Sequence, residues 1–359
     1  MIGPKESRRG PGGSRNMARR RDFRIALDIG GNCIKMVSYH LDSTKTSRLS
    51  RLWLTDLIAE ETIKRPADAS EALFEEAFAG WIKDTPYKKA SVRLCLSASE
   101  SNLFVVTLPH VGIEDLDKAL FWELRPLLSQ PVENYRYVYQ VLSHEKKQIT
   151  LLVGLYEKNR LERVLRILKK VGMRPDVVET DTLAAVDLFL KELDEIDKPL
   201  GFLQLGANHS NYAILSPDDH PHFLFIPFGG NKLTEMIAKD KGISFSKAET
   251  VRRAAGKKKT GKKKTGDIKY IDEMIGDLSR TIVRFNAHYR EKTGQKLSKI
   301  YMTGGLLNDP IIAKAVSGKR SSFQVPSEFW DPLENYFPQE LIEPNYSYHF
   351  TSALGLALR

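Results

Sequence analysis

Three short glycine-containing segments hold residue types that suit the binding of a phosphorylated ligand. In the first, Asp28, Gly30 and Gly31 form the expected tip of a hairpin, and Lys35 follows in its second strand. Glycine allows backbone amides to approach phosphate oxygens, a carboxylate holds magnesium, usually through water, and an ammonium group offsets phosphate charge. Taken alone, the pattern favours an ordinary hairpin turn, in which Asp and Gly are common for conformational reasons.

A second and a third glycine segment follow at the ends of other expected strands. Gly206 lies between strands predicted over 200–205 and 211–215, in the same layout as the first hairpin. Gly304 and Gly305 directly follow another predicted strand, where the backbone could pass close to a flat adenine ring, although a plain strand-to-helix turn is an equally good interpretation. Because the strand, glycine turn and strand recur in the second half of the chain, the sequence predicts two similar α/β lobes that face each other across a cleft.

The chain is long enough to build the two lobes that this recurrence implies. It has 359 residues, of which 42% are hydrophobic, and it exceeds the length at which a single core usually divides. Hydrophobic periodicity assigns elements to most of the first half. The predicted strands are 23–27, 33–40, 90–97, 103–108, 135–142, 148–156 and 177–178, and the predicted helices are 66–82, 115–127, 161–171 and 183–193.

Charge and cysteine content narrow the function classes. The net charge of +10 arises from a basic tail over residues 1–22 and a lysine-rich loop over 256–266, and the rest of the chain is nearly neutral. Both segments are rich in glycine and lack aromatic residues, so we expect solvated appendages rather than a folded nucleic-acid reader; electrostatic attraction to anionic lipid or to nucleic acid is the alternative. Cys33 and Cys95 are too few for a disulfide framework or a zinc site and suit a reducing cytoplasm.

Four segments together resemble the nucleotide motifs of actin-like ATPases, especially those of the PilM and FtsA families. Residues 26–35 resemble the first phosphate motif, 206–208 the second, 227–234 the segment that follows it, and 303–305 the adenosine motif. The resemblance implies that ATP and Mg²⁺ bind between the lobes. The implied nucleotide-binding residues are Asp28, Gly30, Gly31, Asn32, Cys33, Lys35, Gly206, Ala207, Asn208, Gly229, Gly230, Lys232, Glu249, Arg252, Gly304 and Gly305, with Glu249 and Arg252 on the adenosine-side helix.

The resemblance also covers an inserted small domain and the end of the sequence. Residues 106–109, 117–131 and 135–139 resemble the β-α-β-β insertion of PilM proteins, and residues 348–359 resemble their closing helix. The implied fold class is α/β, with duplicated actin-like (ribonuclease H-like) lobes around a nucleotide cleft. The implied domains are a first lobe over 23–198 with the insertion at about 50–145, a second lobe over 199–347, and a C-terminal helix over 348–359 that returns to the first lobe.

One position departs from the family pattern. Gln204 stands two residues before Gly206, where the second phosphate motif usually has Asp, and a neutral amide cannot replace that carboxylate in organising magnesium and the attacking water. Asp28 and Gln204 are therefore the expected metal-site positions, and we expect weak or absent hydrolysis. Glu179 and Asp181 lie in a segment that resembles the one positioning catalytic water, although helix capping is the preferred interpretation of Asp181.

The resemblance implies a cytoplasmic ATP-binding scaffold of a type IV pilus or type II secretion inner-membrane platform. Its implied partner is the N-terminal peptide of a PilN-like membrane protein, with self-association as a further expectation. Two alternatives remain, namely an active actin-like ATPase and a filament-forming division protein similar to FtsA. The FtsA alternative is the weaker of the two, because the sequence does not end in an amphipathic membrane helix of the FtsA kind.

Overall fold

The computed structural model describes residues 23–41, 47–56, 76, 90–97, 101–193, 195–255, 265–317, 323–337, 342 and 348–359. The predicted basic tail and nearly all of the lysine-rich loop lie outside the described residues. So does the helix predicted over 66–82, apart from the single helical residue Glu76. None of the helices in the described ranges combines the length and the apolar character that a membrane crossing requires.

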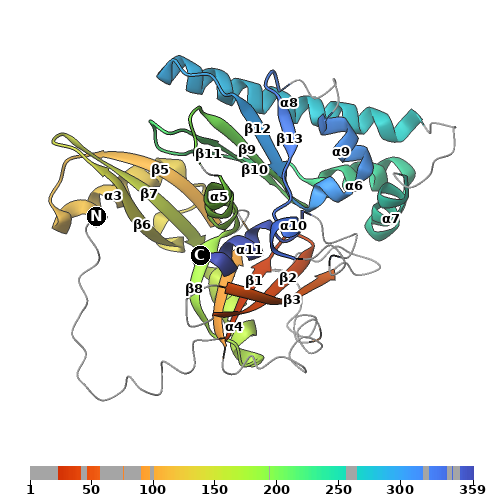
Figure 1. Ribbon diagram of the computed structural model, residues 1–359, viewed down its shortest axis with the longest axis horizontal. Coiled ribbons are helices and arrows are strands. Elements are labelled where there is room, and N and C mark those ends of the chain that lie inside the picture. The colour runs from red at the N-terminus through yellow and green to blue at the C-terminus, as the bar shows by residue number, and fades with distance from the viewer. Residues whose placement is uncertain are drawn as a thin grey trace.

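The first sheet has five strands in the order β3-β2-β1-β4-β8 (Figure 1). They are β1 (Phe23–Ile29), β2 (Cys33–Leu41), β3 (Ser47–Asp56), β4 (Ser91–Leu96) and β8 (Pro175–Thr180). Strand β1 pairs antiparallel with β2 and parallel with β4, and both of its faces are buried. Ile25 and Leu27 pack against helix α4 (Lys158–Lys170), while Ala26 packs on the other face against helix α11 (Thr351–Leu358). The β1–β2 hairpin that the sequence predicted is thus confirmed at the centre of this sheet.

The second sheet repeats the arrangement of the first. Its order is β11-β10-β9-β12-β13, so that β9 takes the place of β1, with an antiparallel hairpin partner on one side and a parallel strand on the other. Its strands are β9 (Leu200–Leu205), β10 (Ser210–Leu215), β11 (His222–Ile226), β12 (Lys299–Thr303) and β13 (Ser327–Phe329). The recurrence of strand, glycine turn and strand therefore reflects a duplicated α/β lobe, as predicted.

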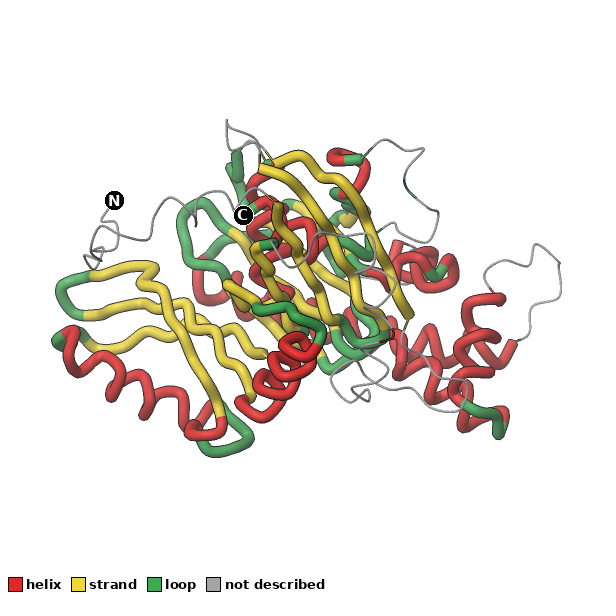
Figure 2. The backbone as a smooth tube through the Cα atoms, turned by 90° about the horizontal axis from the view of Figure 1, so that it is seen from below, coloured by secondary structure: helices red, strands yellow, loops and turns green. Residues whose placement is uncertain are grey.

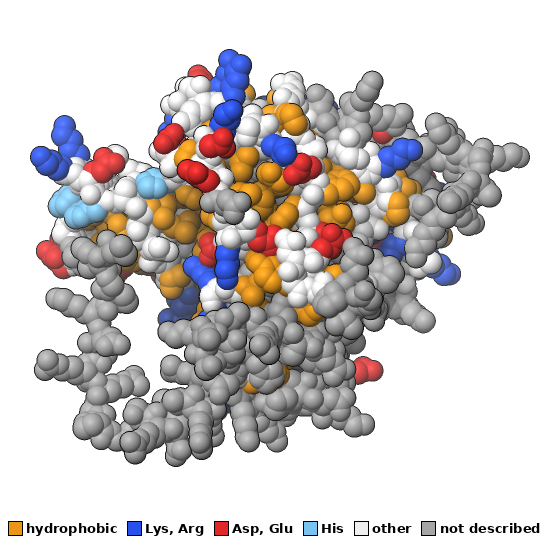
Figure 3. Space-filling view, viewed as in Figure 1, with side chains coloured by type: hydrophobic (Ala, Val, Ile, Leu, Met, Phe, Trp, Pro, Cys, Tyr) orange, Lys and Arg blue, Asp and Glu red, His pale blue; other side chains and the backbone are white. Residues whose placement is uncertain are grey.

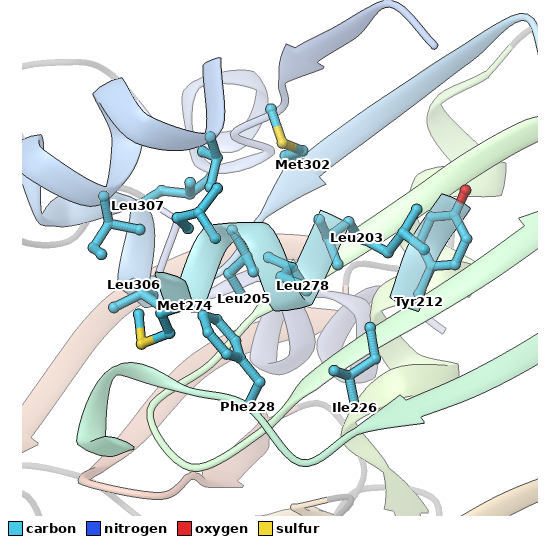
Figure 4. Close-up of a cluster of buried hydrophobic side chains, with 14 of the residues drawn as sticks. Leu203, Leu205, Tyr212, Ile226, Phe228, Met274, Leu278, Met302, Leu306 and Leu307 are labelled. Atoms are coloured by element: carbon cyan, nitrogen blue, oxygen red, sulfur yellow. The ribbon is translucent and has the colours of Figure 1, made fainter. Parts of the chain in front are cut away.

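Long helix α8 (Thr265–Thr293) covers the outer face of the second sheet (Figure 1). Figure 4 shows Met274 and Leu278 of this helix beside Leu203 and Leu205 of β9, and all four side chains are buried. Burial of one such side chain contributes about 1.5–3 kcal/mol to the free energy of unfolding. The packing of α8 on β9 is therefore an important part of the hydrophobic core of the second lobe. The other helices of this lobe are α6 (Gly230–Lys241), α7 (Phe245–Ala255), the 3-10 helix η6 (Gly305–Asn308) and α9 (Pro310–Ser317).

A separate three-stranded sheet with one covering helix projects from the first lobe (Figure 2). It consists of β5 (Ser101–Pro109), β6 (Tyr135–His144), β7 (Gln148–Glu157), α3 (Leu116–Leu124) and the 3-10 turns Ile113–Asp115, Arg125–Leu127 and Val132–Asn134. Its limits differ from the insertion expected at about 50–145, because β3 and β4 in that range are strands of the first sheet. The helix predicted over 115–127 stops being α-helical at Leu124, before Pro126, which lacks the amide that would continue it.

Helices α5 (Asp181–Glu192) and α11 fill the space between the two large sheets. Phe189 of α5 packs on Phe202 of the second sheet and on Trp330, with ring centroids 5.0 Å apart in both cases. Helix α11 packs against α5 and the first sheet, and a short helix, α10 (Leu333–Tyr336), packs beside it. Figure 3 shows hydrophobic side chains over the middle of the molecule, between patches of mixed charge. The last residues of the sequence thus belong structurally to the first lobe.

Gly355 allows α11 to lie directly on α5. A Cβ atom at this position would overlap the carbonyl oxygen of Ala184, which is backbone and cannot turn aside. We expect Gly355→Ala to lower the free energy of unfolding by about 1–3 kcal/mol through overpacking, despite the better helix propensity of alanine. Urea unfolding monitored by circular dichroism measures the change.

Gly276→Ala is the matched control on helix α8. A Cβ atom there meets only the flexible end of Arg280 at 3.3 Å, so the substitution should be neutral or should stabilise by up to about 1 kcal/mol. Equal unfolding free energies for the unaltered chain and Gly355→Ala would contradict the close α5–α11 contact.

Candidate functional site

The three glycine segments meet at one cleft between the lobes. The cleft has a volume of about 340 Å³ and is lined by residues of both sheets and of the segment before α11. The first two turns close in the same way, since the Gly30 amide donates to the Cys33 carbonyl at 3.0 Å and the Gly206 amide donates to the His209 carbonyl at 3.1 Å. The third turn adjoins the second because β12 runs parallel to β9, which brings their carboxyl ends to the same edge.

Most of the sequence-predicted site residues line this cleft. Those that do are Asp28, Gly30, Gly31, Asn32, Cys33, Lys35, Asp181, Gln204, Gly206, Ala207, Gly230, Glu249, Arg252, Gly304 and Gly305. Four others lie outside it. Asn208 and Gly229 form part of the wall behind the second turn, where a Cβ on Gly229 would overlap the backbone of Ala207. Lys232 is exposed on α6, and Glu179 is buried elsewhere.

Asp28 and Lys35 form a buried ion pair at the base of the first turn. Lys35 Nζ lies 2.6 Å from Asp28 Oδ2, and a Cβ on Gly30 would stand 2.8 Å from the same ammonium group. Burial raises the pKa of the Asp28 carboxyl, although the Lys35 charge opposes this shift. Burial alone would lower the pKa of Lys35, but the Asp28 carboxylate outweighs it and raises the pKa, so the ammonium group stays charged beside the turn.

A cluster of amide side chains joins the two lobes at the floor of the cleft. Asn32 of the first turn and Asn231 of α6 exchange two hydrogen bonds, each of 2.7 Å, and both residues are buried. Asn231 also donates to the side-chain oxygen of Asn208 in the second turn. A Cβ on Gly31 would lie 2.7 Å from the Asn208 amide nitrogen, so the first and second turns are in direct contact.

A second ionic cluster forms the wall beside the third turn. Arg252 of α7 lies 2.7 Å from a Glu249 oxygen and 2.6 Å from an Asp309 oxygen, and Thr234 of α6 donates to Glu249 at 2.6 Å. Burial would raise the pKa of Glu249, but Arg252 and the hydrogen bonds lower it to about 2. This carboxylate therefore stabilises the fold above its ordinary pKa of 4.5, and the contribution is lost as the pH falls towards 2. Burial raises the pKa of Asp309, which shares the same guanidinium group.

Gly304 adopts a conformation that other residues rarely take. Its φ is +105°, and a Cβ there would overlap the backbone of Leu205, so only glycine lets the ends of β9 and β12 approach this closely. On the neighbouring Gly305, a Cβ would lie 2.5 Å from the ring of His349. His349, which the sequence analysis missed, therefore contacts the third turn directly.

Gln204 is held by hydrogen bonds rather than facing the cleft freely. Its amide nitrogen donates to Ser352 Oγ at 2.8 Å, and Asn211 donates to its amide oxygen at 3.5 Å. Ser352 Oγ in turn donates to the backbone carbonyl of Asp181 at 3.0 Å. The amide thus connects strand β9 of the second lobe to the first turn of α11.

The two candidate polarisers occupy different environments. Glu179 does not line the cleft, because its carboxylate pairs with the guanidinium group of Arg359. Asp181 does line it, and its Oδ2 lies 3.5 Å from Nε2 of His209. Helix α5 is capped by Thr180 and not by Asp181 as we had expected, since Thr180 Oγ1 accepts the Leu183 amide at 3.2 Å. The Asp181 carboxylate does not cap the helix; it lines the cleft and accepts a hydrogen bond from Thr182 Oγ1 at 3.2 Å.

The described residues contain no group of three or more His, Cys, Asp or Glu side chains arranged to hold a metal ion. Asp28, Asp181 and Gln204, which all carry side-chain oxygen atoms, line the cleft, and oxygen donors with several retained waters are what Mg²⁺ prefers. The donors therefore fit a magnesium ion that arrives with a phosphate chain better than one held by the protein alone. Asp28 would hold such an ion through water, since its carboxylate is already paired with Lys35.

Several lining residues were missed by the sequence analysis. Asp309 had a recognisable signal, because an Asp-Pro pair directly before a helix is a typical helix start, and Asp309 Oδ1 accepts the Ile311 amide at 3.0 Å. Asn231 lies within the 227–234 segment that the sequence analysis singled out, but nothing there marked it as a site residue, and His209 and His349 had no local signal. Their place in the site comes from contacts with residues that are distant in the sequence.

Comparison with known proteins places this geometry in a family. The chain matches the family described as "Type IV pilus assembly protein PilM" over residues 26–359. Among solved structures it matches a PilM-PilN type IV pilus biogenesis complex, with a TM-score of 0.74 and 22% identity over 94% of this chain and 98% of that chain. Ethanolamine utilization protein EutJ from Carboxydothermus hydrogenoformans matches with a TM-score of 0.50 and 11% identity, over 94% of this chain and 89% of that chain. Among curated proteins there is no match.

The architecture and these similarities agree on the fold class. Two lobes of the same topology face each other across a cleft in the actin-like ATPase fold, as the sequence predicted. The match to the family begins at Ala26 in β1, before the first glycine turn, and extends to Arg359. The chain belongs to the PilM family of type IV pilus assembly proteins.

Proposed function

We propose that the chain is a nucleotide-binding scaffold of type IV pilus assembly, in which ATP and Mg²⁺ between the lobes set the lobe geometry. The observation that carries this proposal is the meeting of the Gly30, Gly206 and Gly304 turns at one cleft. Backbone amides at such turns suit phosphate oxygens, and the charged Lys35 ammonium lies beside the first turn. The third turn, with the Glu249–Arg252 wall, would border the nucleoside.

Weak or absent hydrolysis is the second part of the proposal. It rests on Gln204, whose amide is engaged with Ser352 and Asn211 and carries no charge for organising magnesium or water. One observation favours the alternative of an active ATPase. Asp181 lines the cleft beside His209, and such a carboxylate could polarise a water molecule.

Peptide capture is the third part, and it concerns the three-stranded sheet. Strand β6 lies at an edge of that sheet and pairs, among the described strands, with β7 alone. Its Val138 is 62% exposed and lies beside Gly154, so an apolar, shallow surface adjoins a free backbone edge. An extended peptide can add to such an edge as a further strand. We therefore propose that β6 takes up the N-terminal peptide of a PilN-like inner-membrane protein, which would hold the chain at the cytoplasmic side of that membrane.

Asp28→Asn tests the nucleotide site. If Asp28 supports the magnesium ion, the dissociation constant of magnesium-ATP should rise about tenfold, as the loss of one charge-assisted contact implies. ATP binding in the presence of EDTA should change much less. Lys232→Ala is the control, because Lys232 is exposed outside the cleft and should bind like the unaltered chain. Equilibrium dialysis measures the dissociation constants of the unaltered chain and of both variants. No binding to the unaltered chain at millimolar nucleotide would refute the proposed site.

Gln204→Asp tests the weak-hydrolysis part. Restoring a carboxylate at the end of β9 should raise the rate of phosphate release by about tenfold or more, because general acid–base and metal-organising groups contribute at least that much. Gln204→Asn should give no such rise, since it keeps an amide. Steady phosphate release by the unaltered chain that stops in Asp28→Asn would instead favour the ATPase alternative.

Val138→Asp tests the peptide surface. A buried, unpaired charge at the centre of the proposed strand pairing should weaken capture at least about tenfold. The probe is the cytoplasmic N-terminal peptide of a PilN-like inner-membrane protein, labelled for fluorescence anisotropy. Trp122→Ser is the control, because Trp122 is 63% exposed on α3, which covers the opposite face of the sheet. A larger loss in Trp122→Ser than in Val138→Asp would place the peptide on α3 and contradict the β6 edge.

A further inference from the structure

Three consecutive residues connect the lobes at the edge of the cleft. Tyr348 packs against the core of the second lobe, where its ring meets Phe329 of β13 in an edge-to-face contact with centroids 6.1 Å apart. Phe350 is 1% exposed and lies in the core that α11 forms with the first sheet. His349 stands between these two anchors and lines the cleft. The segment is therefore a bridge whose middle residue faces the proposed ligand site.

The backbone of the bridge is held in an unfavourable conformation. Tyr348 has a φ of +61°, in the left-handed region that a bulky side chain rarely adopts. Such conformations persist where the surroundings impose them, and they are concentrated at ligand sites. Here the anchors in two different cores impose the turn, and the turn places the ring of His349 towards the cleft.

The ring of His349 lies on the third glycine turn. A Cβ on Gly305 would be 2.5 Å from both Cε1 and Nδ1 of the ring, so the imidazole occupies the space that any larger residue would take. Leu306 and Pro310, which follow Gly305, line the same part of the cleft. Apolar surfaces beside a flat ring suit a heteroaromatic base better than they suit a phosphate group.

The protonation state of the His349 ring also favours contact with the nucleoside half of a nucleotide rather than with its phosphate chain. Burial, together with the nearby cations of Lys35 and Arg253, lowers the pKa of His349 to about 3. The imidazole is therefore neutral at neutral pH and offers one donor and one acceptor. A nucleoside has both donors and acceptors for such a ring, whereas a phosphate chain offers acceptors alone.

We propose that His349 is a specificity-determining residue that contacts the base and ribose of the bound nucleotide. The inference rests on the proposed nucleotide-binding function and adds the residue that distinguishes a nucleoside phosphate from bare polyphosphate. Because Tyr348 and Phe350 are anchored in different lobes, a ligand that contacts His349 also acts on the bridge between them. The contact thus links occupancy of the cleft to the position of α11.

His349→Ala and His349→Asn test this role in the full chain. Loss of the ring should raise the dissociation constant of ADP about tenfold, as the loss of one hydrogen bond implies, and should leave that of inorganic tripolyphosphate unchanged. His349→Asn keeps a donor and an acceptor near the position of Nδ1 and should recover part of the ADP affinity. His288→Ala is the control, because His288 is exposed on α8. Isothermal titration calorimetry gives the constants, and thermal unfolding without ligand reports folding.

The outcomes separate this inference from the proposed function. Unchanged ADP affinity in His349→Ala would overturn the inference while leaving the nucleotide site in place. An equal loss of ADP and tripolyphosphate affinity would assign His349 to the phosphate chain and overturn it as well. If His349→Ala folds poorly, His349→Asn provides the test. The inference then requires that His349→Asn binds ADP more weakly than the unaltered chain and binds tripolyphosphate equally well. Failure of the unaltered chain to bind ADP or magnesium-ATP would count against the proposed function itself.

Discussion

The reciprocal hydrogen bonds between Asn32 and Asn231 fix how the two lobes face each other. Each amide both donates and accepts at 2.7 Å, and both side chains are buried. A buried amide that loses its partner costs about 1–3 kcal/mol, so sliding one lobe past the other would leave polar groups unpaired on both sides. Asn208 extends the contact to the second turn. The spacing of the first two glycine turns, and hence the shape of the cleft, depends on this small cluster.

Charges in the cleft are already paired by the protein. Asp28 is paired with Lys35, and Arg252 is shared between Glu249 and Asp309. Burying such ions without partners would cost several kcal/mol each, so the pairs keep the walls in place between the lobes. The two pairs differ in what they leave for a ligand. Lys35 lies beside the glycine turn and can share its charge with a phosphate group, whereas the Arg252 guanidinium is committed to two carboxylates and shapes the wall.

The sequence predicted what depends on local pattern. The β1–β2 and β9–β10 hairpins follow from alternating apolar residues around glycine turns, and their recurrence was sufficient to predict two facing lobes. Two features could not be predicted because they depend on contacts between distant residues. Glu179 is paired with Arg359, a residue from the other end of the sequence, and the His349 ring reaches Gly305 through a turn with no glycine signal.

The insertion limits and the helix cap show a different kind of failure, in which the local signal was present but ambiguous. The strand predicted over 90–97, which is β4, suits a small domain as well as the first sheet, and only its pairing with β1 decides between them; β3 was not predicted as a strand. Thr180 and Asp181 are both good capping residues, and the choice depends on where the helix begins. Because the cap is Thr180, one residue before Asp181, the Asp181 carboxylate lines the cleft and does not accept hydrogen bonds from the helix amides as a cap.

Gln204 shows why a change that removes a charge need not be a simple loss. A carboxylate at this position could accept hydrogen bonds but could not donate one to Ser352, as the Gln204 amide does at 2.8 Å. Ser352 passes the connection to the Asp181 carbonyl, so the amide joins the second sheet, the start of α11 and the start of α5. The Gln204 amide therefore ties the cleft to the C-terminal helix. Under the proposed scaffold role, this connection would let a bound nucleotide act on the arrangement of the lobes.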